Sequence, residues 1–181
     1  MTDENLNINE ERLIATARAD IREFNTLYLK YVQAVFRYHL SRIGSRAEAE
    51  DATAQTFLSA LEGFGRYRHE GHFAAWLFSI ARHKAADHFR SNGRFTDLKD
   101  SIPSADVDLL QQSVHNDQLA ALMRRVRDLP AEEQELLRLR YAAELSHAEI
   151  GKLLHLSQDA VKKRIYRTLE RLQVQLEEPN E

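Results

Sequence analysis

The chain has 181 residues, of which 43% are hydrophobic and 29% charged, with few Gly and Pro. This composition is typical of a soluble globular protein and favours helices. Cysteine is absent, which excludes disulfides, thiolate metal sites and cysteine nucleophiles and fits a cytoplasmic location. The net charge of -3 argues against a protein that coats DNA unaided.

The N-terminus reads MTDENLNINEERL, with acids where a signal peptide needs a basic segment. No apolar run approaches the roughly 18 residues of a membrane span. We therefore expect no membrane insertion, and residues 1–20 are interpreted as an N-terminal extension.

Apolar residues then recur at steps of three and four from Ile21 to Ile43, which predicts one helix with one buried face. Gly44 is expected to end this helix, and Ser45 to cap the next one. That second helix has an acidic first turn and continues through Phe57, Leu58 and Leu61.

The stretch GRYRHEGH, Gly65 to His72, predicts a loop because Gly alternates with basic and aromatic residues. Helical periodicity returns in a third helix from Phe73 to Phe89. Loop and helix together carry more basic than acidic residues, which favours a nucleic-acid partner.

Periodicity is lost between Ser91 and Asn116, where acids, Ser and Pro103 predict a flexible acidic linker between two helical domains. A helix containing Leu119 and Val126 opens the second domain. Pro130 is expected in the first turn of the following helix, where proline is tolerated.

A helix-turn-helix is predicted near the C-terminus. Ser146 and Glu149 form a capping box before a short helix, and Ser157 can cap a second helix after the tight connection at His155. The second helix has an apolar face made of Val161, Ile165, Leu169, Leu172 and Leu176. Its opposite, basic face is made of Gln158, Lys162, Lys163, Tyr166 and Arg167, with Arg164 and Arg171 close by. Such a face can enter a major groove, although basic amphipathic helices also occur as ordinary solvated surfaces.

Both halves of the chain resemble sigma-70 family proteins, in the short form of the extracytoplasmic-function (ECF) group. Region 2 of that family is resembled by three segments of this chain, FNTLYLKYVQAVFRYHLSRIG, AEAEDATAQTFLSAL and FAAWLFSIARHKAADHFR. Region 4 of the family is resembled by the segment LPAEEQELLRLRYAAELSHAEIGKLLHLSQDAVKKRIYRTLERL. The resemblance implies an all-α fold of two small helical domains. It divides the chain into an extension (1–20), region 2 (21–90), an acidic linker (91–115), region 4 (116–176) and a tail (177–181).

The resemblance also implies site residues and partners. Core RNA polymerase would be bound by Glu48, Glu50, Asp51, Gln55 and Phe57. The minus-10 promoter element would be bound by Arg66, Tyr67, Arg68, His69, Trp76, Arg82, His83 and Lys84, with Tyr67 and His69 as stacking surfaces for an unpaired base. The minus-35 element would be read by Ser157, Gln158, Lys162, Lys163, Arg164, Tyr166 and Arg167. An anti-sigma factor is a further expected partner, and no cofactor is implied.

Three positions depart from the family pattern. Ala54-Gln55 removes a negative charge from the expected polymerase-binding helix. His155 stands where the turn often has Gly, and a left-handed conformation there would cost on the order of 1 kcal/mol. Lys163 replaces a small Ser, which predicts an unusual minus-35 preference.

Other interpretations remain open at this stage. Helical spacing makes Trp76 and Phe73 core residues more readily than stacking residues. The pairs His69 with His72 and His83 with His88 lack the spacing of a helical metal site, so we expect no metal. No phosphate loop or nucleophile elbow suggests an enzyme. A self-sufficient dimeric helix-turn-helix regulator, or a module that binds a partner helix without DNA, would also fit.

Overall fold

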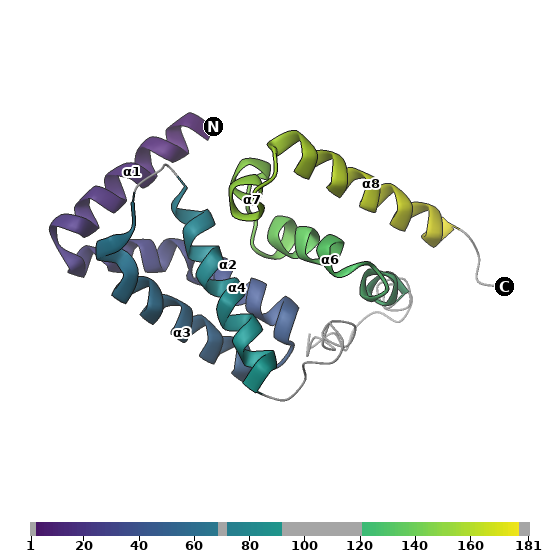
Figure 1. Ribbon diagram of the computed structural model, residues 1–181, viewed down its shortest axis with the longest axis horizontal. Helices are drawn as coiled ribbons and strands as arrows, with labels where there is room; N and C mark the ends of the chain where they lie inside the picture. Colours follow the sequence, from purple (N-terminus) through teal and green to yellow (C-terminus); the bar gives the residue numbers. More distant parts are fainter. Residues whose placement is uncertain (1–2, 69–71, 92–120, 178–181) are drawn as a thin grey trace, which may run out of the picture.

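The computed structural model describes residues 3–68, 72–91 and 121–177, and every regular element in these ranges is a helix. The predicted all-α class is therefore confirmed. The elements α1 to α4 form one body and the helices from 121 onward form a second (Figure 1). Most of the predicted linker (91–115), the start of the predicted region 4 and the residues from 178 onward lie outside the described residues.

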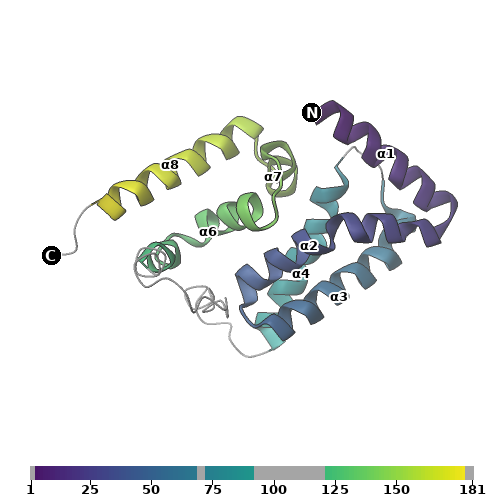
Figure 2. The same ribbon diagram turned by 180° about the vertical axis from the view of Figure 1, so that it is seen from behind.

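The N-terminal extension contains a helix, α1 (Asp3–Ala19), that the sequence reading did not predict. Ile14 and Ala17 on α1 are each only 1% exposed, so this helix packs on the rest of the N-terminal domain. α1 contacts α2, and both opposite views show the two helices meeting at one end and diverging from there (Figures 1 and 2).

The helix expected to begin at Ile21 begins three residues later, so that start was wrong. Ile21–Glu23 is instead a 3-10 turn, η1, and α2 runs from Phe24 to Ile43. The Asp20 carboxylate accepts the backbone N–H of Arg22, which caps the 3-10 turn locally. Ile21 is left 54% exposed and takes no part in the buried face.

The remaining N-terminal helices follow the predicted order. Gly44 ends α2 with a positive φ of 96°, which glycine adopts without strain. Ser45 caps α3 (Arg46–Gly63), the 3-10 turn η2 spans Phe64–Arg66, and α4 spans Phe73–Ser91. Their shared core is rich in aromatic side chains, namely Phe24, Tyr31, Tyr38, Phe57, Phe64, Tyr67, Phe73 and Phe78.

The C-terminal domain is built on aliphatic side chains. Helices cover residues 121–127, α6 (Ala131–Leu137), α7 (His147–Leu154) and α8 (Gln158–Glu177). Pro130 is the residue before α6 rather than a member of its first turn. The largest contributions to the core come from Leu136, Leu139, Ile150, Val161, Ile165 and Leu172.

α6 continues into a wide π-helical turn, η3 (Arg138–Ala142). Such turns are rare and each accommodates one extra residue in a helix. The chain leaves the turn through Glu144, which has a φ of 58°, before Leu145 returns to the core at 3% exposure.

The two domains touch directly. α4 contacts α7, and α2 contacts η3. The sequence reading gave only a linker between the domains, so this contact is a new observation. Within the described residues, no helix is both long and apolar enough to cross a membrane.

Candidate nucleic-acid and polymerase interfaces

The helix-turn-helix has the capping that the sequence predicts. The Ser146 hydroxyl accepts the backbone N–H of Glu149 at 3.2 Å, and the Glu149 carboxylate accepts the backbone N–H of Ser146 at 2.7 Å. The hydroxyl of Ser157 accepts the N–H of Ala160 at 3.1 Å. Both helices of the motif therefore start at fixed residues.

His155 forms the turn in a left-handed conformation, with φ 56° and ψ 41°, as expected. The next residue closes the turn, because the Leu156 N–H donates to the Gly151 carbonyl at 2.8 Å. Gly151 itself leaves no room for a side chain. A Cβ at this position would lie 2.7 Å from the Leu156 carbonyl oxygen, so α7 and the turn approach as closely as backbones can.

The basic face of α8 is open to solvent. Val161, Ile165 and Leu172 are buried, whereas Ser157, Gln158, Lys162, Lys163, Arg164, Tyr166 and Arg167 are all exposed. Leu176, predicted to belong to the apolar face, is 42% exposed, so the buried stripe ends earlier. The Lys162 ammonium lies 6.0 Å from the centre of the Tyr166 ring.

Two basic side chains of α8 pair with acids of α6. Arg164 lies 3.8 Å from Glu132 of α6, and Arg171 bonds Glu133 of the same helix. Both pairs anchor α8 to its own domain. Gln158, Lys162, Lys163, Tyr166 and Arg167 thus form the free part of the surface, which we call the α8 face.

The loop expected to hold an unpaired base presents charge but buries its tyrosine. Arg66 and Arg68 are exposed, while Tyr67 is only 6% exposed. The Tyr67 ring packs against Phe73 at 5.5 Å and Trp76 at 4.7 Å between centres. In this conformation Tyr67 offers no face for stacking, contrary to expectation, because the core takes its ring. His69 lies outside the described residues.

The α4 residues of the same predicted set fall into different environments. Trp76 is half-buried and contacts Phe73 as well as Tyr67, in keeping with a core role. His83 is exposed, with Nδ1 2.7 Å from the Ser79 carbonyl, and Lys84 is half-buried. Arg82 is bonded to the other domain, as described below.

One residue outside the predicted set holds this loop. Arg18 of α1 donates to the Tyr67 carbonyl, and its guanidinium lies 6.0 Å from the centre of the Tyr67 ring. A cavity of about 770 Å³ lies beside this contact, lined by Ala17, Arg18, Ile21 and the segment 64–68. No spacing in the sequence pointed to Arg18, because the contact joins segments far apart in the chain.

The residues predicted to bind polymerase share α3 but not one face. Glu50, Asp51 and Gln55 are exposed, and Gln55 donates to Asp51 at 2.7 Å. Glu48 is half-buried and lies 3.7 Å from His88 of α4. Phe57 is 6% exposed and packs on Tyr28, with 4.8 Å between ring centres, so it supports α3 from inside.

An apolar surface beside these acids was missed. Leu58 and Leu61 on α3 are 58% and 40% exposed, and Leu29 on α2 is 64% exposed. Between the two helices lies a groove of about 340 Å³, lined by Tyr28, Val32, Gln33, Phe36, Arg46, Glu50, Thr53 and Ala54. Tyr28, which lines the groove, is itself 38% exposed, and large exposed apolar residues are typical of a protein-binding surface.

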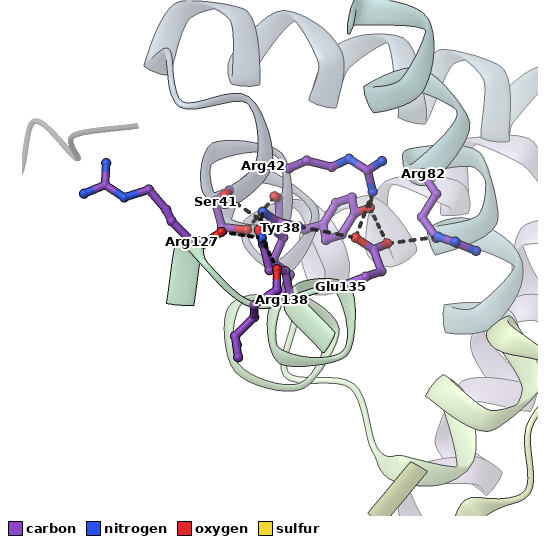
Figure 3. Close-up of polar contacts among 9 residues, drawn as sticks. Tyr38, Ser41, Arg42, Arg82, Arg127, Glu135 and Arg138 are labelled. Carbon is purple, nitrogen blue, oxygen red and sulfur yellow. Dashed lines mark hydrogen bonds and ion pairs between the residues drawn. The ribbon is translucent and has the colours of Figure 1, made fainter. Parts of the chain in front are cut away.

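A buried carboxylate joins the two domains (Figure 3). One oxygen of Glu135 on α6 accepts the Tyr38 hydroxyl and the Arg82 guanidinium, each at 2.9 Å. Its other oxygen accepts Arg42 at 2.8 Å. Arg138, from its own domain, lies 3.9 Å away. We call these five residues the Glu135 cluster.

The cluster is short of negative charge, since one carboxylate faces three guanidinium groups. Burial lowers the pKa of Arg138, against the attraction of Glu135, and the neighbouring Arg42 lowers it further. Burial, followed by the charge of Glu135, raises the pKa of Tyr38 above its ordinary value, so Tyr38 stays a hydrogen-bond donor.

A buried histidine lies next to the cluster. His39 of α2 has no exposed surface, and its Nε2 lies 3.0 Å from the Thr56 hydroxyl. Burial lowers the pKa of His39 to about 4, and the charges of Arg42 and His88 add to this. His39 is therefore neutral at physiological pH. Within the described residues, no three potential metal ligands gather at one place.

Comparison with known proteins agrees with this division. Residues 27–95 match the family model of sigma-70 region 2, and residues 119–172 match that of sigma-70 region 4. The chain is 36% identical to the ECF RNA polymerase sigma factor BldN of Streptomyces coelicolor, over 82% of this chain and 58% of BldN. It is 32% identical to the ECF RNA polymerase sigma factor SigD of Mycobacterium tuberculosis, over 76% of this chain and 69% of SigD.

Solved structures share the fold. CnrH, in its complex with the cytosolic domain of CnrY, matches with a TM-score of 0.62 at 23% identity and covers 91% of this chain and 94% of CnrH. The sigma factor RpoE of Bartonella quintana, bound to the anti-sigma factor NepR, matches with a TM-score of 0.60 at 22% identity, over 88% of this chain and 99% of RpoE. The two family matches and the identity to SigD and BldN establish that the chain belongs to the sigma-70 family, in its ECF group.

Proposed function

We propose that this chain directs core RNA polymerase to a restricted set of promoters, with α8 reading the minus-35 element as duplex DNA. The observation that carries this proposal is the α8 face, in which Lys162, Lys163, Tyr166 and Arg167 are exposed on a helix with a fixed start. Long cationic side chains on a recognition helix reach phosphates and guanine edges in the major groove.

Region 2 acts at the minus-10 element. The exposed Arg66 and Arg68 support backbone contacts to a single strand, and the cavity beside them supports an extruded nucleotide. Stacking by Tyr67 would require its ring to leave the core, so we assign the positioning of the strand to the arginines first.

Core polymerase binds at the α2–α3 groove. The exposed Leu29, Leu58 and Leu61 supply apolar area, and Glu50 at the groove supplies charge. An interface with an apolar centre and a charged rim is typical of a stable protein contact. We further propose an anti-sigma factor as a regulator and the cytoplasm as the location, on the strength of family membership alone.

Run-off transcription with core polymerase tests the proposal. With a library of genomic promoters, adding the chain should stimulate a small subset of transcripts. Leu58→Asp should abolish stimulation by weakening the polymerase contact, while Leu176→Asp, which changes an exposed leucine at the far end of α8, should act normally. If stimulation is absent and the free chain binds two-fold symmetric duplex sites tightly, the chain is a self-sufficient regulator instead.

A further inference from the structure

The contact between the domains includes a network of ions and hydrogen bonds beside the apolar core that the two domains share. Besides the Glu135 cluster, Arg37 of α2 donates to the Ala142 carbonyl at 2.9 Å and pairs with Glu144 at 3.0 Å. Arg138 donates to the Ser41 carbonyl at 3.3 Å. Each of these bonds joins α2 of region 2 to the segment 138–144 of region 4.

Glu135 is the centre of this contact. It is 7% exposed, and all three of its short bonds reach side chains of region 2. Tyr38 and Arg42 come from α2 and Arg82 comes from α4, so one carboxylate ties region 4 to two helices at once (Figure 3). Its neighbour Glu132, on the same helix, is 88% exposed and pairs with Arg164 of region 4.

We propose that Glu135 is a latch that holds the free chain in a closed form and keeps Arg82 from DNA. The closure itself depends only on contacts within the chain, whereas the role of Arg82 rests on the function proposed above. In the closed form, the guanidinium of Arg82 is bonded to Glu135, so DNA and the latch compete for the same group.

The ionic part of the interface should cost little to open. Taking ions out of water costs about as much as their mutual attraction returns, so a buried ionic contact is weak evidence of stability. Here the charges are also unequal, and a cavity of about 480 Å³ remains between the domains, lined among others by Arg42, Arg82, Glu135 and Arg164. On opening, Glu135 and its partners regain water.

The length of a promoter also calls for opening. Positions named minus-35 and minus-10 are about 25 base pairs apart, or roughly 85 Å of duplex at 3.4 Å per base pair. A compact chain of this length is expected to be roughly 40 Å across. Region 4 must therefore leave region 2 for both elements to be contacted together.

Energy transfer between two dyes measures the closure. Because the chain has no cysteine, dyes can be placed by Glu62→Cys on α3 and Glu170→Cys on α8, which are both exposed. Glu135→Gln turns an amide N–H toward the arginines and removes the charge. It should lower transfer efficiency in the free full-length chain, whereas Glu132→Gln, the matched control, should leave it unchanged.

Binding of short, random-sequence single-stranded DNA measures the release of Arg82. Glu135→Gln should bind the labelled strand roughly threefold to tenfold more tightly, because a larger fraction of the chain is competent to bind. Adding Arg82→Ala to Glu135→Gln should remove that gain.

The outcomes separate the two claims. Unchanged transfer in Glu135→Gln overturns the latch. Lower transfer without tighter binding overturns the withholding of Arg82 and leaves closure standing. Tyr38→Phe, which deletes one hydroxyl and keeps the ring, guards against misfolding, since it should open the chain partly with helix content retained. None of these readouts requires transcription, so failure of the proposed function would not be mistaken for failure of the latch.

Discussion

The two surfaces assigned to DNA differ in how they are held. The α8 face stands free on a helix that starts at Ser157 and is anchored through Arg171 and Glu133. The region 2 surface is divided, since Arg66 and Arg68 are exposed, Tyr67 is buried and Arg82 is bonded to Glu135. On the proposed assignment, the duplex-reading surface is exposed in the free chain, whereas strand capture would require a rearrangement.

This difference suits the binding role proposed for each surface. Duplex DNA presents a fixed groove, and a rigid helix matches it at little cost in ordering. An unpaired base becomes available only after the duplex opens, so holding back Tyr67 and Arg82 until then would limit binding to other strands. We therefore expect region 4 to be rigid and DNA binding by region 2 to depend on the release of Tyr67 and Arg82.

The largest effect is expected from Gly151→Ala. The new Cβ would meet the Leu156 carbonyl at 2.7 Å, and neither backbone can move away freely. We expect a loss of about 3 kcal/mol in the free energy of unfolding, at the upper end for overpacking. Denaturant unfolding measures it. Gly65→Ala is the control, because its Cβ would meet nothing within 4 Å; equal losses in both variants would refute a rigid turn.

The second-largest effect is expected from acid, which should lower the stability of region 2 through His39. The pKa of His39 is about 4 in the folded chain and near 6.5 when unfolded. Between these pH values only the unfolded state takes up the proton on His39. The contribution of neutral His39 to the free energy of unfolding is therefore fully present above pH 6.5 and is lost as the pH falls toward 4. The expected loss is about 3 kcal/mol.

Unfolding curves followed from pH 7 to pH 4 test this window. His39→Gln should flatten the pH dependence there, since the amide does not titrate. A variant that keeps the full slope would show that other groups, such as surface carboxylates, cause the acid sensitivity.

A smaller effect is expected on the α8 face. Arg167→Ala should cost about 1 to 3 kcal/mol at a single minus-35 base if Arg167 pairs with a guanine edge. Lys162→Ala should instead weaken all sequences alike and reduce the salt dependence, as a phosphate contact does. Transcription from a set of minus-35 variants distinguishes the two patterns, and a uniform loss for both residues would remove base reading from Arg167.

The smallest effect is expected from Arg18→Ala. The side chain is exposed, so its bond to the Tyr67 carbonyl should contribute only about 0.5 to 1 kcal/mol. Open-complex formation should slow up to about fivefold while polymerase binding stays normal. Arg12→Ala, on the same helix, should change neither; a loss of polymerase binding in Arg18→Ala would instead indicate a wider defect in region 2.

Local chemistry explains which parts of the fold the sequence could predict. The capping box at Ser146, the cap at Ser157 and the left-handed His155 all depend on residues within a few positions, and the structure has all three. Helical periods likewise predicted α3, α4 and α8, because each repeats over many residues.

Contacts between distant segments could not be predicted in this way. The bond from Tyr38 to Glu135 joins residues 97 positions apart, and neither residue stands out in its own helix. Tyr67 was assigned to a surface because Gly and Arg surround it, yet the aromatic core of Phe64, Phe73 and Trp76 takes its ring. Periodicity reports which face of a helix is buried, but not what covers it.

The wide turn at η3 decides how the residues that follow it face region 2. An α-helix turns by about 100° per residue, so one additional residue rotates everything that follows by that amount. In η3 the extra residue is absorbed, so that Leu139 stays in the core while the Ala142 carbonyl meets Arg37. Deleting one residue of η3 should therefore rotate Ala142 away from Arg37 and break their bond, while the Glu135 bonds, which precede the turn, should remain.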